Sequence, residues 1–172
     1  QAAKESAMRK HVYSVDLKGK SKQLTTEEGS NNAKFSNTFD YYILNHSTIN
    51  TPPSYGIYDR KGKLIRALED NERISNLQEE HGTAPMEFFD FTTADNVKLN
   101  GWMLKPADFD ESKEYPVFMY LYGGPGSQQV TDGWKGQNYW WFQMLAQQGF
   151  IVACVDNRGT GARGEEFKKV TY

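Results

Sequence analysis

Hydrophobic and polar positions alternate with a period of two near the beginning of the chain. Tyr13, Val15 and Leu17 fall on one side of the alternation, and polar residues lie between them. This is the pattern of a half-buried β-strand, in which successive side chains point to opposite faces. A turn containing glycine follows, and a second short strand through residues 23–25 completes a predicted β-hairpin.

The same hairpin pattern recurs further along the chain. Residues 16–20 read Asp-Leu-Lys-Gly-Lys and residues 59–63 read Asp-Arg-Lys-Gly-Lys, with strand-like residues at 55–58 and 64–68 on either side of the second turn. The offset of 43 residues lies within the period of about 40 to 45 residues that β-propeller blades show. A single repeated pair also fits a plain antiparallel meander, so the pattern by itself leaves both architectures open.

The residues between the two hairpins add a further strand. Residues 32–37 lead into residues 39–44, whose aromatic and β-branched content is typical of an inner strand. Two prolines within residues 51–54 interrupt the pattern, because proline has no N–H to donate to a β-ladder and restricts the residue before it. We therefore expect antiparallel β-sheet throughout the first part of the chain.

The pattern becomes helical after residue 68. Ile74, Leu77 and Gln78 lie at helical spacing, and Gly82 and Pro85 mark the end of the predicted helix. We place a domain boundary in this segment, after residue 72.

The part that follows predicts an α/β arrangement. Residues 86–92 and 97–104 form a second kind of hairpin, and two strongly apolar runs then occur at residues 117–122 and 150–155. The apolar runs do not alternate, which is typical of strands covered on both faces. Strand, helix and strand in this order almost always place the two strands in parallel.

The helix predicted between the two apolar runs is rich in aromatic residues. Trp141, Met144, Leu145 and Gln148 fall on one side of it, and Gly149 marks its end. We expect the aromatic residues of this region to pack against the sheet rather than to form a platform for sugars or bases. These residues are Trp134, Tyr139, Trp140 and Trp141.

Composition and charge narrow the range of partners. The formal net charge of -2 and the pI near 6.0 give no broad basic field, so we expect no nucleic-acid partner. No run reaches the roughly 18 to 20 apolar residues that cross a bilayer, so we expect no membrane segment. Cys154 is the single cysteine; it cannot form an intrachain disulfide, and it is expected to be buried. The chain begins with Gln1 rather than Met, and we expect an internal piece of a longer protein.

Glycine-rich loops follow both apolar runs, where open α/β sheets gather their ligands. They occupy residues 121–129 and 156–164. Residues 159–164 match G-x-G-x-x-G, but the acidic residue needed about 20 positions later would fall past Tyr172. A nucleotide-binding α/β domain therefore stays as a minor hypothesis.

The two loops resemble the hydrolase domain of the prolyl oligopeptidase family, in particular its dipeptidyl peptidase IV branch. Residues 120–129 read Tyr-Leu-Tyr-Gly-Gly-Pro-Gly-Ser-Gln-Gln and residues 156–161 read Asp-Asn-Arg-Gly-Thr-Gly. The resemblance implies a mixed fold, with residues 1–72 as C-terminal β-propeller blades and residues 73–172 as the N-terminal part of an α/β-hydrolase domain, both incomplete. It also implies a serine exopeptidase that cleaves dipeptides from N-termini after proline or alanine and needs no cofactor or metal.

The resemblance assigns one catalytic residue. Tyr122 matches the tyrosine whose hydroxyl contributes to the oxyanion hole. Other residues are expected to shape the loops at the active site: Gly123, Gly124, Pro125, Asp156 and Arg158. We expect the last two of these to form a charge-assisted brace with each other.

We expect the other candidate residues to have no catalytic role. The chain has no G-x-S-x-G motif, so we expect the Ser-Asp-His triad beyond the C-terminus and an inactive isolated chain. Ser127 is expected to be a loop residue, and His11, His46 and His81 are expected to be ordinary surface residues.

For the parent protein, the resemblance implies peptide substrates with penultimate proline or alanine, a homodimer and a periplasmic or cell-envelope location. A tripeptidyl or acylaminoacyl peptidase of the same family remains an alternative. So does a non-catalytic propeller interaction module that binds peptides.

Overall fold

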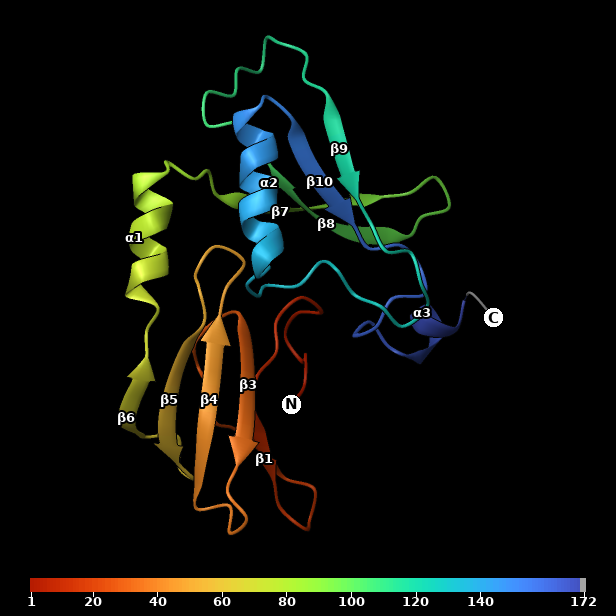
Figure 1. Cartoon of the computed structure of the whole chain (residues 1–172). Coiled ribbons are helices and arrows are strands. Elements are labelled where there is room, and N and C mark those ends of the chain that lie inside the picture. Colours follow the sequence, from red (N-terminus) through yellow and green to blue (C-terminus); the bar gives the residue numbers. More distant parts are fainter. Residues whose placement is uncertain (171–172) are drawn as a thin grey trace. The chain divides into compact units, whose positions relative to one another are not determined.

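The computed structural model describes residues 1–170 (Figure 1). The chain forms two compact units. The first comprises Gln1–Leu77 together with Thr131–Trp134, and the second comprises the rest of the described chain. Within the described residues, no helix has the length and apolar character that crossing a membrane requires.

The first unit consists of antiparallel β-sheet. Strands β1 (Tyr13–Val15) and β2 (Ser21–Gln23) form a two-stranded sheet. A four-stranded sheet follows in sequence order, formed by β3 (Ser30–Phe35), β4 (Tyr41–Ser47), β5 (Ser54–Asp59) and β6 (Leu64–Glu69). Four antiparallel strands in chain order form one blade of a β-propeller. The prediction of propeller blades in this part is confirmed.

The repeated turns have the same hydrogen bonds. Asp16 Oδ1 accepts the backbone N–H groups of Lys18 and Lys20 at 3.0 and 2.8 Å. In the second turn, Asp59 Oδ1 accepts those of Lys61 and Lys63 at 2.8 and 2.9 Å. The glycine of each turn has a positive φ, 84° in the first and 93° in the second, which glycine adopts at little cost. The sequence repeat is therefore also a structural repeat, and both predicted hairpins are confirmed.

The core of the first unit differs from the predicted apolar face of the first strand. Val12, Tyr42 and Leu44 are buried together, and Tyr42 stacks on Tyr58 with ring centroids 5.5 Å apart. Val15 is exposed, and so is Leu17. The expectation that alternation buries these side chains was wrong because the two-stranded sheet β1–β2 exposes that face.

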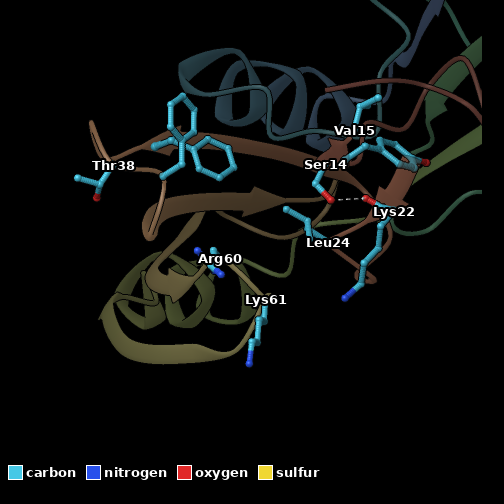
Figure 2. Close-up of a pocket in the computed structure, with 10 residues that line it drawn as sticks. Ser14, Val15, Lys22, Leu24, Thr38, Arg60 and Lys61 are labelled. Carbon is cyan, nitrogen blue, oxygen red and sulfur yellow. Dashed lines mark hydrogen bonds between the residues drawn. The ribbon is translucent and has the colours of Figure 1, made fainter. Parts of the chain in front are cut away.

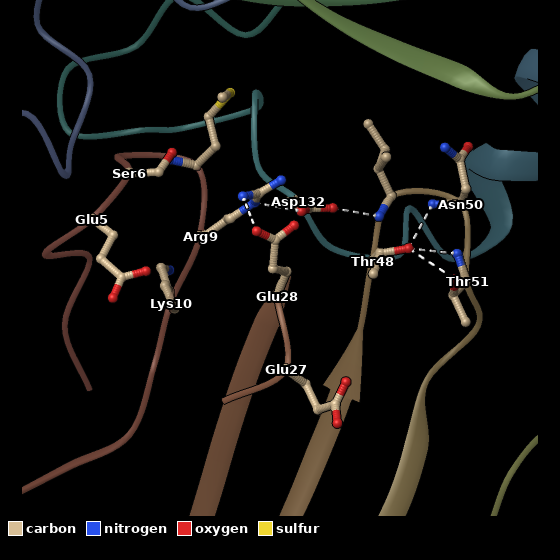
Figure 3. Close-up of polar contacts among 12 residues, drawn as sticks. Glu5, Ser6, Arg9, Lys10, Glu27, Glu28, Thr48, Asn50, Thr51 and Asp132 are labelled. Carbon is tan, nitrogen blue, oxygen red and sulfur yellow. Dashed lines mark hydrogen bonds and ion pairs between the residues drawn. The ribbon is translucent and has the colours of Figure 1, made fainter. Parts of the chain in front are cut away.

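A short segment from the middle of the sequence completes the first unit. The carboxylate of Asp132 is buried; its Oδ2 accepts a hydrogen bond from Arg9 Nε at 3.0 Å, and its Oδ1 accepts one from the Ile49 N–H at 3.0 Å (Figure 3). Arg9 also pairs with Glu28 at 2.9 Å (Figure 3). Both carboxylate oxygens of Asp132 are therefore satisfied, as a buried charge requires.

The second unit is built on a mixed sheet. Its strands are β7 (Met86–Thr92), β8 (Lys98–Leu104), β9 (Val117–Tyr120) and β10 (Ile151–Val155), in the spatial order β7-β8-β10-β9. The pairs β7–β8 and β8–β10 are antiparallel, and β9–β10 is parallel. Helix α1 (Glu72–Glu80) precedes the sheet, α2 (Gln137–Gln147) connects β9 to β10, and α3 (Glu165–Lys169) follows β10. The predicted α/β arrangement with parallel apolar strands is confirmed.

Helix α2 buries a different face from the predicted one. Its buried residues are Tyr139, Phe142, Gln143 and Ala146. Phe142 packs on Trp102 and Tyr120 of the sheet, with ring centroids 5.1 and 5.2 Å away. Trp141 and Met144 are 40% and 44% exposed, because each lies about 150° around the helix from the centre of the buried face. Trp141 still packs edge-on against Phe118 of β9, with ring centroids 5.1 Å apart.

The two apolar strands also differ in their burial. Strand β10 lies between β8 and β9 and is buried along its centre, including Cys154. Strand β9 is at the edge of the sheet, and its Val117 and Met119 are exposed. The expectation that both runs are covered on both faces is thus confirmed for β10 and wrong for β9. Within the described chain, β9 and β7 are the edge strands of this sheet, and β10 is an interior strand.

Candidate active site

Tyr122 lies two residues past the end of β9, with 68% of its surface exposed. Strand β9 runs parallel to β10, with Tyr120 in register with Cys154. The carboxyl ends of both strands therefore meet at the same edge of the sheet, where ligands bind in open α/β folds. A phenol hydroxyl at this place is accessible to a substrate.

Glycine allows the ring of Tyr122 to lie against the backbone. A Cβ atom on Gly124 would lie 2.4 Å from Cε1 of Tyr122 and 3.0 Å from its Cδ1. Gly123, which stands between these two residues in the sequence, has a φ of 75°. Residues with a side chain rarely adopt this conformation. The Gly-Gly pair thus decides where the aromatic ring can lie.

The loop after β10 is bonded to the loop that carries Tyr122. The N–H of Gly126 donates to the carbonyl of Gly159 at 2.8 Å. Asp156 is 7% exposed, and its two carboxylate oxygens accept the N–H groups of Gln129 and Val130 at 2.8 and 3.0 Å. These bonds fix the two glycine-rich loops to each other.

The charge of Asp156 is balanced within the same region. Burial raises the pKa of Asp156, while the two backbone N–H groups and the nearby cations Lys135 and Arg163 act in the opposite direction. Lys135 Nζ donates to the carbonyl of Gln129 at 3.0 Å, so this cation is bonded to the loop as well.

The predicted brace between Asp156 and Arg158 does not form. Arg158 instead pairs with Asp95 at 2.9 Å in an exposed ion pair. A hydrogen bond from the Thr93 hydroxyl, and to a lesser extent Arg158, holds the pKa of Asp95 below its usual value. The prediction was wrong because the carboxylate of Asp156 is taken up by two backbone N–H groups. Sequence reasoning missed this use, although an acidic residue directly after a buried strand was a visible signal.

The other candidate residues are not brought together into a catalytic group. Ser127 lies in the loop, as predicted. His11 is buried, with Nδ1 3.1 Å from the carbonyl of Thr25, so its prediction as a surface residue was wrong. His46 Nε2 lies 2.7 Å from the carbonyl of Glu28, and His81 is exposed and edge-on to Trp140.

The described residues offer little support for a metal or nucleotide site. Within residues 1–170, no group of three His, Cys, Asp and Glu side chains could hold a metal ion. The G-x-G-x-x-G segment leads into α3, whose first turn carries Glu165 and Glu166. Two carboxylates at a helix N-terminus disfavour a phosphate there.

The first unit also contains a cavity. It has a volume of about 610 Å³ and lies between the β1–β2 hairpin and the turns of the four-stranded sheet (Figure 2). Aromatic and cationic side chains line it, among them Phe35, Phe39, Lys22 and Arg60. Its lining includes no carboxylate, histidine or cysteine.

Two family models match opposite ends of the chain. The model described as "Dipeptidyl peptidase IV (DPP IV) N-terminal region" matches residues 1–53. The model described as "Prolyl oligopeptidase family" matches residues 136–172. The first match falls on the antiparallel sheets, and the second begins just before α2.

Individual relatives match along nearly the whole chain. Curated proteins named "Probable dipeptidyl-aminopeptidase B" are 34% identical over 97% of the chain in Arthroderma gypseum and 35% identical over 98% of it in Talaromyces marneffei. The crystal structure of Porphyromonas gingivalis dipeptidyl peptidase 4 is 44% identical over 99% of the chain, with a TM-score of 0.92. The chain spans 18% and 19% of the two curated relatives and 24% of the solved structure.

Proposed function

The chain belongs to the prolyl oligopeptidase family, and from this premise we propose that the whole protein is a serine exopeptidase. Its reaction is the removal of dipeptides from peptide N-termini after proline or alanine. The 172 residues contain no G-x-S-x-G motif, so the nucleophile is supplied by other residues of the whole protein.

One observation carries the proposal for this part of the molecule. The exposed hydroxyl of Tyr122 lies just past the end of a strand in a parallel pair, and its ring lies against Gly124. A donor fixed before the reaction begins stabilises the negative charge that develops on the carbonyl oxygen in the tetrahedral intermediate. The role of Tyr122 is thus that of one donor of the oxyanion hole.

We also propose the domain assignment and the assembly of the whole protein. Residues 1–72 belong to a β-propeller domain and residues 73–172 to a hydrolase domain; the two family models support this division because they match on opposite sides of the boundary. The whole protein acts as a homodimer on peptide substrates, which light scattering and product analysis would test.

The first experiment measures hydrolysis of glycyl-prolyl-4-nitroanilide by the whole protein and by its Tyr122→Phe variant. Loss of one oxyanion-hole donor lowers kcat by about 10² to 10³, and we expect a loss of this size with a smaller change in KM. Gly124→Ala is a second variant, expected to lower kcat because its methyl group displaces the Tyr122 ring. The 172-residue chain alone is expected to be inactive.

Further measurements distinguish dipeptide release from the alternative peptidase activities. Mass spectrometry of products from a longer peptide distinguishes release of dipeptides from release of tripeptides or an acylated residue. A Tyr122→Phe variant with unchanged kcat would remove the oxyanion role. A whole protein that hydrolyses none of these peptides would contradict the peptidase assignment.

A further inference from the structure

Asp156 connects the end of β10 to the loop after β9 through a buried carboxylate. We propose that Asp156 is a positioning residue for Tyr122: it fixes the loop that holds the phenol hydroxyl at the reacting carbonyl. The inference rests on the proposed function, and it assigns to Asp156 a role that its neighbour Arg158 does not share.

The backbone of Asp156 is itself fixed by the sheet. Its N–H donates to the carbonyl of Asn100 in β8 at 3.1 Å, and the residue before it, Val155, is in register with Gly101 of the same strand. The carboxylate therefore extends from the central part of the sheet rather than from a free loop. Groups held on regular elements position a site more accurately than groups on loops.

The two hydrogen bonds require a carboxylate. Oδ1 accepts from Gln129 and Oδ2 accepts from Val130, so both oxygens face an N–H donor. An asparagine offers one acceptor oxygen and one NH₂ donor. One of the two backbone N–H groups would then face another donor and lose its partner, which is costly at a buried site.

The bonded residues extend this attachment toward Tyr122. The side chain of Gln129 accepts a hydrogen bond from the Tyr120 hydroxyl at 3.4 Å and donates to Ser127 Oγ at 3.0 Å. Gly126 is bonded to Gly159 at 2.8 Å. Tyr122 therefore lies between two points of the loop, Tyr120 and Gly126, that are both tied to other residues.

Burial raises the pKa of Asp156, and nearby positive charges act against this shift. Lys135 and Arg163 are the cations that act on it, and Cys154 in the preceding strand β10 is a neutral thiol, because burial raises the pKa of Cys154 to about 12. Replacing Asp156 by a neutral residue therefore also removes a negative charge near these two cations.

The experiment compares Asp156→Asn with wild type in the whole protein, alone and combined with Tyr122→Phe. Misplacing a catalytic group by about 1 Å costs up to about 10² in rate, and we expect Asp156→Asn to lower kcat by roughly 10- to 100-fold with a smaller change in KM. In the Tyr122→Phe background the same change is expected to cost much less, because the group that it positions is already gone. Asp90→Asn is the matched control: this exposed residue pairs with Lys98, and its loss should leave kcat unchanged.

A second measurement does not depend on activity. Hydrogen exchange followed by mass spectrometry reports the segment that contains the Gln129 and Val130 amides. In wild type this segment should exchange slowly, and in Asp156→Asn it should exchange markedly faster, whereas Asp156→Glu, which keeps two acceptor oxygens, should restore part of the protection and part of kcat.

Two outcomes would overturn the inference. The first is an equal loss of kcat from Asp156→Asn with and without the Tyr122 hydroxyl, and the second is fast exchange of this segment in wild type. The exchange result can be read even if Asp156→Asn does not fold, because the wild-type protein alone decides it. Lack of peptidase activity in wild type with intact protection would instead count against the proposed function.

Discussion

At the scale of single residues, burial is the main influence on the acidity of Cys154. Its side chain is fully buried in β10, and desolvation, followed by the nearby charge of Asp156, raises the pKa of the thiol from 9.0 to about 12. The thiol therefore stays protonated and unreactive in the folded chain near neutral pH.

This shift predicts a loss of stability in alkali. The unfolded chain releases the thiol proton near pH 9, while the folded chain keeps it until about pH 12. The contribution is thus complete below about pH 9 and is lost as pH rises toward 12. Urea denaturation from pH 8 to 11 should show a smaller decline for Cys154→Ala than for wild type, even though the variant begins less stable. Equal slopes would contradict the shift.

At the scale of elements, the two Asp-x-Lys-Gly-Lys turns are the same local structure in different surroundings. Both glycines have a positive φ. A Cβ atom on Gly62 would lie 2.9 Å from the carbonyl oxygen of Leu24, whereas a Cβ atom on Gly19 would meet nothing within 4 Å. The pair therefore separates the cost of backbone conformation from the cost of crowding.

We expect Gly19→Ala and Gly62→Ala to destabilise the chain by different amounts. A left-handed conformation costs an alanine about 1 to 2 kcal/mol, and this is the whole expected loss at position 19. At position 62 the clash with the Leu24 carbonyl adds about 1 to 3 kcal/mol. Urea denaturation followed by circular dichroism measures both. Equal losses would show that the second turn moves freely away from Leu24.

At the scale of the whole molecule, the edge strand β9 determines how the isolated chain should behave. It is hydrogen-bonded to β10 on one side, and the described chain supplies no strand on the other. Val117 and Met119 are exposed on it, and so is Leu121, the residue just past its end. An edge strand with exposed apolar side chains is a site of association between chains.

The isolated 172-residue chain is therefore expected to self-associate. Light scattering coupled to size-exclusion chromatography should show a dimer or larger species that grows with concentration. Met119→Lys should shift the chain toward monomer, because a charge on an edge strand opposes pairing. Lys34→Met, which changes the β3 strand of the other sheet, serves as a control that should not reduce association. A wild-type chain that stays monomeric at high concentration would refute this prediction.

The candidate site was predictable only in part. The Gly-Gly-Pro loop and its tyrosine could be identified because glycines directly after a buried strand are a local signal. The contacts of Asp156, Arg158 and His11 could not, because each depends on residues distant in the sequence: Gln129 and Val130, Asp95, and Thr25.

The sequence by itself determined the strands, their turns and the change from antiparallel to α/β structure. These follow from the period of apolar residues and from the backbone conformations that glycine and proline allow, which act over a few residues. Only the tertiary structure decided which face of α2 is buried, that β9 rather than β10 is the edge, and that Asp132 lies buried among residues of the first unit. These outcomes depend on which surfaces meet when the chain folds, and burial is a property of such long-range packing rather than of any local segment.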